Sequence, residues 1–361
     1  ADFRTIRPVM QSPPSSRSSA CRFLSGRSAL VLLLVLSVLP AAGCKPEAPA
    51  TPDGGTGTDG PGALPGSTPS TFTSWYDEET KTQKQAEGQK QYGKRTGLWT
   101  YWFEDGSKQG EGTFASGERD GRWTAWHPNG QKHTEAIFEA GVLSGGNREW
   151  YENGQLAYEV QFEGGEQNGP GLRFHPDGSK AASESWEKGK RVGTWTEWYP
   201  NGQKASEAKY VEGLRQGVAR SWFESGQLAS EGEYVDDLAE GPIVKYWEDG
   251  SVHQRGEMSK DKLIGTSIRT FPTGVLQAKI SFDEDGNAHG RTCEWHPNGQ
   301  VAVTGEIEHG KRIGLWYFFT VSGAILTEES GLYEGETKTA ELTSADIEAF
   351  DPTVCDATIP E

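Results

Sequence analysis

The sequence predicts an all-β protein: an elongated, twisted, single-layer antiparallel sheet of about ten 24-residue β-hairpin repeats. Three observations lead to this prediction. Only 34% of the 361 residues are hydrophobic, while 47 are glycine and 13 are tryptophan. Such a chain is too poor in aliphatic residues for a large compact core and too aromatic for disorder. Nearly identical stretches of twelve residues recur, such as GRWTAWHPNGQK at 121–132 and GTWTEWYPNGQK at 193–204, and each ends in a turn sequence.

Two glycines define the repeat. The first recurs every 24 residues, with one step of 25, at Gly97, Gly121, Gly145, Gly169, Gly193, Gly217, Gly241, Gly265, Gly290 and Gly314. The second follows nine residues later in all ten copies, at Gly106, Gly130, Gly154, Gly178, Gly202, Gly226, Gly250, Gly274, Gly299 and Gly323. We number positions from the first glycine as zero. A register kept over this length identifies a repeat architecture.

The second glycine lies in a hairpin turn. In most copies Asn or Asp precedes it between short aromatic runs, which is the strongest local signal for a β-hairpin. Where proline occupies the first turn position, it fixes φ near −65°, and glycine at the third enters the left-handed region without steric cost. A type I turn followed by a left-handed glycine is therefore expected.

Side-chain facing follows by alternation if the residue before the turn proline pairs with the residue after the turn glycine. On this register, aromatic residues at position five, such as Trp102 and Trp126, share a face with those at position seventeen, such as Phe114 and Phe138. These residues are expected to form a structural ladder.

The opposite face then supplies the candidate binding residues. They are tryptophans at position two (Trp99, Trp123, Trp195 and Trp316) and glutamates at position fourteen (Glu111, Glu135 and Glu207). Because position two is not tryptophan in every copy, we take it as a contact position that the fold does not require. Simple packing against a cross-strand neighbour is the alternative.

The N-terminal 43 residues carry export signals. Arg17, Arg22 and Arg27 precede an apolar run at 29–40, and Ala-Ala-Gly leads into Cys44. This pattern resembles a bacterial lipoprotein signal peptide (1–43), which implies cleavage before Cys44 and lipid anchoring through it in the cell envelope. Lys45 favours the outer over the inner membrane. A transmembrane anchor or an ordinary secretory signal is the alternative, although about 12 apolar residues are short for a span.

Residues 44–74 are dominated by Pro, Gly, Ser and Thr, and are expected to form a disordered tether. Residues 75–96 read as a degenerate half-repeat. The pattern Gly-x-Trp-x-x-Trp-Tyr-Pro-Asn-Gly-Gln-Lys in 97–335 resembles the bacterial variant of the MORN (membrane occupation and recognition nexus) repeat. That resemblance implies a chain of hairpins used as a scaffold or interaction surface. Many such proteins are labelled antitoxins, which fits poorly with an exported lipoprotein.

No catalytic motif is found, so an enzyme is not expected. His127, His175 and His296 share one slot, but hairpins two repeats apart are separated by roughly 19 Å, too far for a common metal ion. HExxH, Gly-x-Ser-x-Gly, phosphate-loop and CxxC motifs are missing from the sequence. Neither a cofactor nor a metal is expected.

Charge limits the partners. Beyond residue 44 there are 30 Lys and Arg against 51 Asp and Glu, a net of −21. This charge repels nucleic acid and anionic lipid headgroups. A protein or glycan partner, membrane attachment through Cys44 alone, and a monomeric chain are expected.

Besides Cys44, the mature chain would contain two cysteines, Cys293 and Cys355. Outside the cytoplasm they would form a disulfide; two free buried thiols are the alternative. The tail, 336–361, includes SADIEAF, expected to begin a short helix capped by Ser344 that covers the last edge strand.

These observations predict a lipid-anchored envelope repeat protein acting as a non-enzymatic binding or scaffolding module. The alternatives are a cytoplasmic antitoxin-type binder and an accessory subunit of an envelope enzyme.

Overall fold

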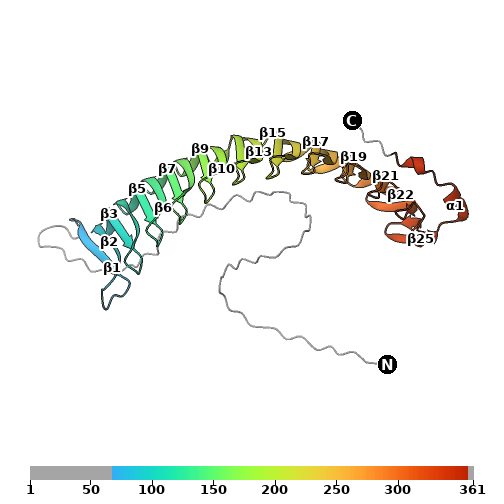
Figure 1. The fold of residues 1–361 in the computed structure, drawn as a ribbon. Helices are drawn as coiled ribbons and strands as arrows, with labels where there is room; N and C mark the ends of the chain where they lie inside the picture. The colour runs from blue at the N-terminus through green and yellow to red at the C-terminus, as the bar shows by residue number, and fades with distance from the viewer. Residues whose placement is uncertain (1–66, 357–361) are drawn as a thin grey trace, which may run out of the picture. The chain divides into compact units, whose positions relative to one another are not determined.

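The computed structural model describes residues 67–356, and these form one open antiparallel sheet (Figure 1). The predicted signal peptide, Cys44 and most of the predicted tether lie outside the described residues. The predicted all-β, single-sheet fold is confirmed. No helix in residues 67–356 is both long and apolar enough to cross a membrane.

The strands follow one another in hairpin order, and each pairs with its neighbours in sequence. The first half contains β1 (Ser70–Trp75), β2 (Lys84–Gln91), β3 (Lys94–Trp102), β4 (Lys108–Ala115), β5 (Glu118–Trp126), β6 (Lys132–Glu139), β7 (Val142–Trp150), β8 (Leu156–Glu163), β9 (Glu166–Phe174), β10 (Lys180–Glu187), β11 (Lys190–Arg191), β12 (Gly193–Trp198) and β13 (Lys204–Val211).

The second half contains β14 (Leu214–Arg215), β15 (Gly217–Trp222), β16 (Leu228–Val235), β17 (Leu238–Tyr246), β18 (Val252–Ser259), β19 (Lys262–Thr270), β20 (Leu276–Phe282), β21 (Ala288–Trp295), β22 (Val301–Glu308), β23 (Lys311–Phe318), β24 (Gly331–Glu334) and β25 (Thr337–Glu341). A short helix, α1 (Ser344–Glu348), and a 3₁₀ turn, η1 (Pro352–Val354), follow.

The predicted hairpin turn is present. In the second repeat, the backbone N–H of His127 donates to the Gln131 carbonyl (2.8 Å) and that of Gly130 donates to the His127 carbonyl (2.9 Å). Gly130 has φ +82°, in the left-handed region that glycine enters without steric cost. The turn chemistry deduced from Pro-Asn-Gly is therefore confirmed.

One residue beyond the turn, a β-bulge reverses the predicted faces. Trp126 pairs with Lys132, but Ala125 pairs with Thr134, so His133 has no partner across the strand pair. A one-residue shift moves every later side chain to the other face. The prediction that positions five and seventeen share a face was wrong, because alternation was extended through this bulge.

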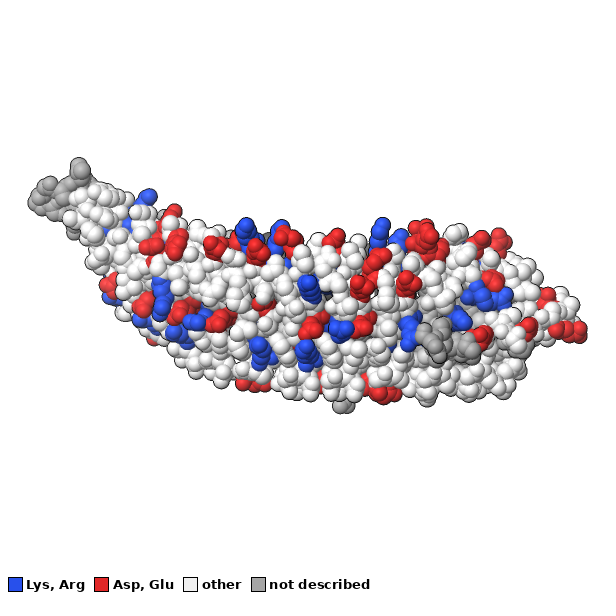
Figure 2. All heavy atoms as spheres, turned by 90° about the horizontal axis from the view of Figure 1, so that it is seen from above, with Lys and Arg blue, Asp and Glu red and all other residues white. Residues whose placement is uncertain are grey.

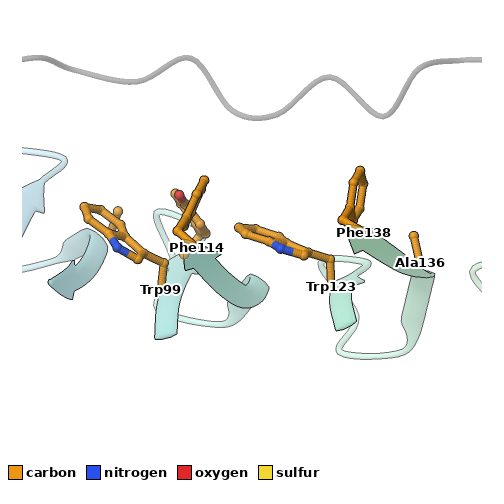
Figure 3. Close-up of a cluster of buried hydrophobic side chains, with 7 residues drawn as sticks. Trp99, Phe114, Trp123, Ala136 and Phe138 are labelled. Carbon is orange, nitrogen blue, oxygen red and sulfur yellow. The ribbon is translucent and has the colours of Figure 1, made fainter. Parts of the chain in front are cut away.

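The core lies on the face that carries positions two, fifteen and seventeen, which we name the tryptophan face. Its rings follow one another from hairpin to hairpin (Figure 3). Trp99 packs on Phe114 (ring centroids 5.9 Å apart), and Phe114 packs edge-on against Trp123 (4.9 Å). Ala136 and Phe138 continue the cluster. Edge-to-face aromatic pairs add about 0.5–1.5 kcal/mol beyond area burial.

Volume on the tryptophan face is shared across neighbouring hairpins. Position fifteen of one repeat pairs with position two of the next, as Gly112 pairs with Trp123. In the copy where position two is Gly171, its partner is the larger Val160. Asn147 pairs with Ala136, so tryptophan at position two is also replaced without such an exchange.

Gly112→Ala is expected to destabilise the sheet by about 1–3 kcal/mol, the usual cost of overpacking. A Cβ at Gly112 would lie 2.3 Å from Cδ2 of the Trp123 indole. Gly110→Ala is the matched control, because the nearest atom to its Cβ is the Thr124 carbonyl oxygen at 3.6 Å. Urea unfolding followed by circular dichroism measures both variants. Equal midpoints would contradict the packing of Trp123 over Gly112.

Both ends of the sheet differ from the predicted boundaries. Strand β1 begins at Ser70, inside the segment predicted as tether, and it contains Thr, Phe and Trp, which favour strands. At the other end, β25 extends the sheet beyond residue 335. Helix α1 is present, but its N-cap is Thr343 rather than Ser344.

The C-terminal tail covers the other face of the sheet rather than the edge strand β25. Phe350 packs on Tyr317 (4.7 Å) and Phe319 (5.1 Å), both on or next to β23. A disulfide joins Cys355 to Cys293 of β21. This tail closes a second small core that includes Ile268, Leu276 and Trp295.

Candidate interaction surface

The position-two tryptophans lie in the core rather than on a contact surface. Trp99, Trp123 and Trp316 are 1%, 8% and 3% exposed. Trp195 is half-buried and packs edge-on against Trp186 (4.9 Å). The predicted placement of these residues on an exposed face was wrong, and the bulge next to each turn is the cause.

These indoles also contact cationic and, in most cases, polar groups. Nε1 of Trp123 donates to the Thr113 carbonyl (2.9 Å), and the Arg119 guanidinium lies 4.5 Å from its ring centroid. Trp99 with Arg95 and Trp195 with Arg191 repeat the cation–π contact. Buried indoles usually have a partner for the N–H, as Trp123 has here. The position-two tryptophans therefore hold neighbouring hairpins together.

The predicted glutamates face the other side of the sheet, beside the position-five tryptophans. We name this side, with positions five, eleven and fourteen, the lysine face. Lys132 donates to Glu135 (3.0 Å), and its ammonium lies 5.3 Å from the ring centroid of Trp150 in the next repeat. The sequence-based prediction placed the tryptophans and glutamates of the candidate site together; the structure separates them onto opposite faces.

This group recurs along the sheet. Lys108 pairs with Glu111 and lies against Trp126, and Lys204 pairs with Glu207 and lies against Trp222. Since a repeat spans two strands, successive groups are about 10 Å apart. Acidic and basic side chains are interspersed along the described sheet in Figure 2. The lysine face thus presents donors and acceptors in the N-terminal half of the sheet, whereas position eleven is apolar from Leu228 onward.

The Lys132–Glu135 pair gives a pH-dependent contribution to stability. The hydrogen bond from Lys132 lowers the pKa of Glu135, against partial burial that raises it. A folded pKa below the unfolded value of about 4.3 stabilises the fold above that pH. The contribution is lost as the pH falls through the lower folded pKa.

Glu135→Gln is therefore expected to reduce stability by about 0.2–1 kcal/mol at pH 7 and to have no effect once the pH lies below the folded pKa. Urea midpoints at pH 7 and pH 3 measure the difference. Glu152→Gln, in an exposed turn, is the control and should leave both midpoints unchanged. An equal effect of Glu135→Gln at both pH values would contradict the ion pair.

The turn edge is held by a third repeated contact. Nε2 of His127 lies 2.8 Å from the Trp150 carbonyl oxygen, and the Tyr151 hydroxyl donates to the Phe174 carbonyl (2.8 Å). His175 and His296 make the same contact with the following repeat. In residues 67–356 no group of three or more His, Cys, Asp or Glu side chains is arranged to hold a metal ion. The histidines of this slot therefore serve as turn-to-turn links.

Sequence reasoning missed a buried carboxylate on the tryptophan face. The side chain of Glu184 is 2% exposed and accepts hydrogen bonds from Arg173 (2.6 Å) and Trp186 Nε1 (3.1 Å). Burial and the Glu184 charge raise the pKa of nearby Tyr158. The repeat position of Glu184 could have revealed it, because position fifteen holds a small or aliphatic residue in most copies.

A cavity of about 380 Å³ lies under the tail. Its lining is Trp295, Gly299, Gln300, Val301, Phe319, Gly323, Phe350 and Cys355. Cys355 is disulfide-bonded, so none of these side chains can transfer a proton or attack as a nucleophile. The lining side chains are apolar or aromatic except for the amide of Gln300.

The comparisons with known proteins agree with the repeats. The profile of the MORN repeat variant matches residues 95–115, 147–163, 191–212 and 215–236. No curated protein matches the chain.

Solved structures give weak likenesses. A TcdB2–TccC3–Cdc42 crystal structure is 12% identical over 70% of this chain and 15% of that chain, with a TM-score of 0.16. A Photorhabdus luminescens Tc holotoxin pore is 10% identical over 71% of this chain and 14% of that chain, with a TM-score of 0.15. The chain thus spans about 15% of the length of the first of these proteins.

Proposed function

We propose that this chain, in which four segments match the MORN repeat variant, is a non-enzymatic binding or scaffolding module held in the cell envelope by a lipid on Cys44. The observation that carries the proposal is the sheet of 25 strands, whose N-terminal half repeats one Lys–Glu–Trp group along the lysine face, at Lys108, Lys132 and Lys204. Solenoids use such extended periodic surfaces for binding.

The partner is a protein or a glycan. On the lysine face, lysine and glutamate side chains supply hydrogen-bond donors and acceptors next to half-buried tryptophans, as Lys132 and Glu135 do next to Trp150. Residues 97–356 contain 24 Lys and Arg against 43 Asp and Glu, a net of −19. This charge disfavours nucleic acid and anionic lipid surfaces as ligands of the sheet.

Attachment to the membrane rests on the sequence before the sheet. The arginines, the apolar run at 29–40 and Ala-Ala-Gly-Cys resemble a lipoprotein signal, and Lys45 favours the outer membrane. One acyl chain binds a membrane only marginally, so the several acyl groups of a lipoprotein anchor are needed for stable attachment.

Membrane fractionation tests this proposal. The wild type and Cys21→Ser, a control at the other N-terminal cysteine, are expected in the membrane fraction after an alkaline wash. Cys44→Ser is expected to leave that fraction. A wild type that stays in the cytoplasm with an uncleaved N-terminus would contradict the proposal and favour a cytoplasmic antitoxin-type binder.

A further inference from the structure

We propose that strand β1 is a docking edge for a second copy of this chain, and that two sheets join antiparallel through β1 into one continuous sheet. An open sheet leaves an edge strand at each end, and an edge strand offers unpaired N–H and C=O groups to another chain. The two edges of this sheet differ in how far they are protected.

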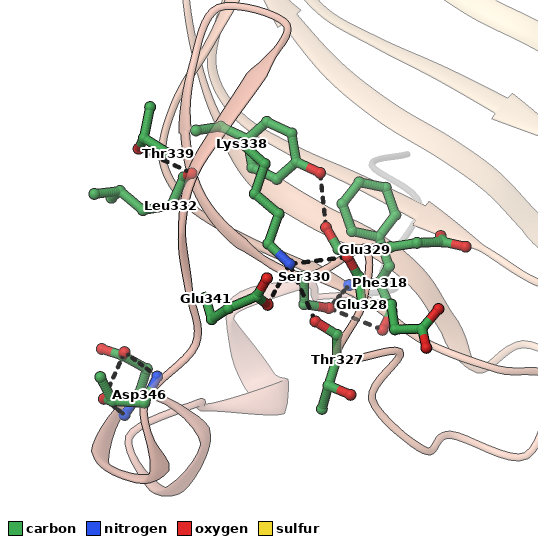
Figure 4. A network of polar contacts seen from close by, with 12 residues as sticks. Phe318, Thr327, Glu328, Glu329, Ser330, Leu332, Lys338, Thr339, Glu341 and Asp346 are labelled. Atoms are coloured by element: carbon green, nitrogen blue, oxygen red, sulfur yellow. Dashed lines mark hydrogen bonds and ion pairs between the residues drawn. The ribbon is translucent and has the colours of Figure 1, made fainter.

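The C-terminal edge is blocked. Strand β25 has only five residues, and its pairing with β24 is interrupted by a bulge between Leu332 and Tyr333. The Lys338 ammonium donates to the carbonyls of Thr327 (3.2 Å) and Glu328 (2.8 Å) and to the carboxylate of Glu341 (Figure 4). Short length, bulges and charged side chains are the usual means of preventing edge pairing.

The N-terminal edge differs from this in its charge. Strand β1 has six residues, Ser-Thr-Phe-Thr-Ser-Trp, with no charge and no proline. Within the described part of the chain it pairs only with β2, in regular register from Ser70↔Lys90 to Ser74↔Ala86, and a bulge follows between Ser74 and Trp75. Thr, Phe and Trp are favoured in strands. Residues 70–74 are therefore a regular, uncharged template for another strand.

The occupant is a second copy rather than the chain's own preceding segment. Pro61, Pro65 and Pro69 precede β1, and a proline cannot donate a ladder hydrogen bond. Two β1 strands are identical, so a two-fold axis at Thr73 would pair Phe72 of one copy with Ser74 of the other. Such an isologous contact closes at a dimer. It also continues the tryptophan face, to which Phe72 belongs through its contact with Trp99 (5.7 Å).

Charge directs two copies to meet at this end. Residues 67–96 contain 5 Lys and Arg against 4 Asp and Glu, whereas residues 97–356 have a net charge of −19. Two copies therefore repel each other along most of their length and least at β1.

Membrane anchoring would further favour the pairing of two copies through β1, and this step alone rests on the proposed function. The part of the predicted tether that precedes β1, about 25 residues at 45–69, would have an r.m.s. reach of about 25–30 Å. Two chains anchored at Cys44 would hold their β1 edges within this reach of the same membrane, which raises their effective concentration.

Cysteine cross-linking of the full chain in cells tests the proposal. Thr71→Cys and Thr73→Cys place a thiol on β1, and Thr339→Cys places one on the blocked edge β25 as the matched control. The parent chain sets the background from Cys21 and Cys44. A covalent product of twice the monomer mass is expected from at least one β1 variant above the parent, and none above the parent from Thr339→Cys. No product from β1, or equal product from both edges, would overturn the pairing.

A second variant separates edge pairing from chance collision. Thr71 is exposed, so adding Thr71→Lys to Thr73→Cys charges the edge without entering the core, and the dimeric product should be lost. Product that persists with Thr71→Lys would overturn the proposal. The membrane fraction is read in the same samples: a membrane-bound monomer contradicts the pairing alone, and a released dimer contradicts the anchor alone.

Discussion

Replacing Trp123 with alanine is expected to lower the free energy of unfolding by about 3–5 kcal/mol. Trp126→Ala, three residues along the same strand, is expected to cost clearly less. Trp123 is 8% exposed, packs on Phe114 at 4.9 Å and donates to the Thr113 carbonyl at 2.9 Å. Trp126 is half-buried on the lysine face, against the Lys108 ammonium at 5.2 Å.

Urea unfolding of the full chain, followed by far-ultraviolet circular dichroism, measures both variants. Because each repeat contacts only its neighbours, the loss in Trp123→Ala should be concentrated in β4–β6, which amide hydrogen exchange resolves. A larger loss from Trp126→Ala would place the core on the lysine face and contradict the bulged register.

Cys355→Ser is expected to remove up to about 4 kcal/mol of stabilisation from the C-terminal repeats, on the loop-entropy relation for disulfides. The bond joins residues 62 apart in sequence. It also holds the tail against Tyr317 and Phe319 through Phe350. Without it, amides of 344–354 should exchange rapidly, and the second core around Trp295 should open to solvent.

Hydrogen exchange of the oxidised wild type, the reduced wild type and Cys355→Ser measures this effect. The last two are expected to behave alike, with β3–β10 unchanged because those strands lie several repeats away. Protection of the tail that is the same in all three samples would show that the aromatic contacts hold it without the disulfide.

The repeat and its turn could be read from the sequence because glycine is needed there. Gly130, at φ +82°, occupies a conformation that other residues adopt at a cost, so the requirement is visible in every copy. The faces could not be read, because the bulged residue His133 needs no special side chain. Its presence reverses all later alternation, and the candidate binding face was misplaced as a result.

Two other features depend on pairing between repeats, which a single hairpin does not reveal. The residue at position two packs on position fifteen of the neighbouring hairpin, as Gly112 opposite Trp123 and Val160 opposite Gly171 show. Strand β1 was assigned to the tether because Ser and Thr dominate its composition. The monomer expected from the sequence stays a prediction, and pairing of two copies through β1 is the proposed alternative to it.

The most direct test of the account is intact-protein mass spectrometry of the chain extracted in detergent, beside Cys44→Ser. We expect a wild-type chain that begins at Cys44 and carries added acyl mass, and a Cys44→Ser chain that lacks this mass. Alkylation without reduction should leave Cys293 and Cys355 unlabelled. An unmodified chain that keeps the residues before Cys44 would contradict the lipid-anchored scaffold.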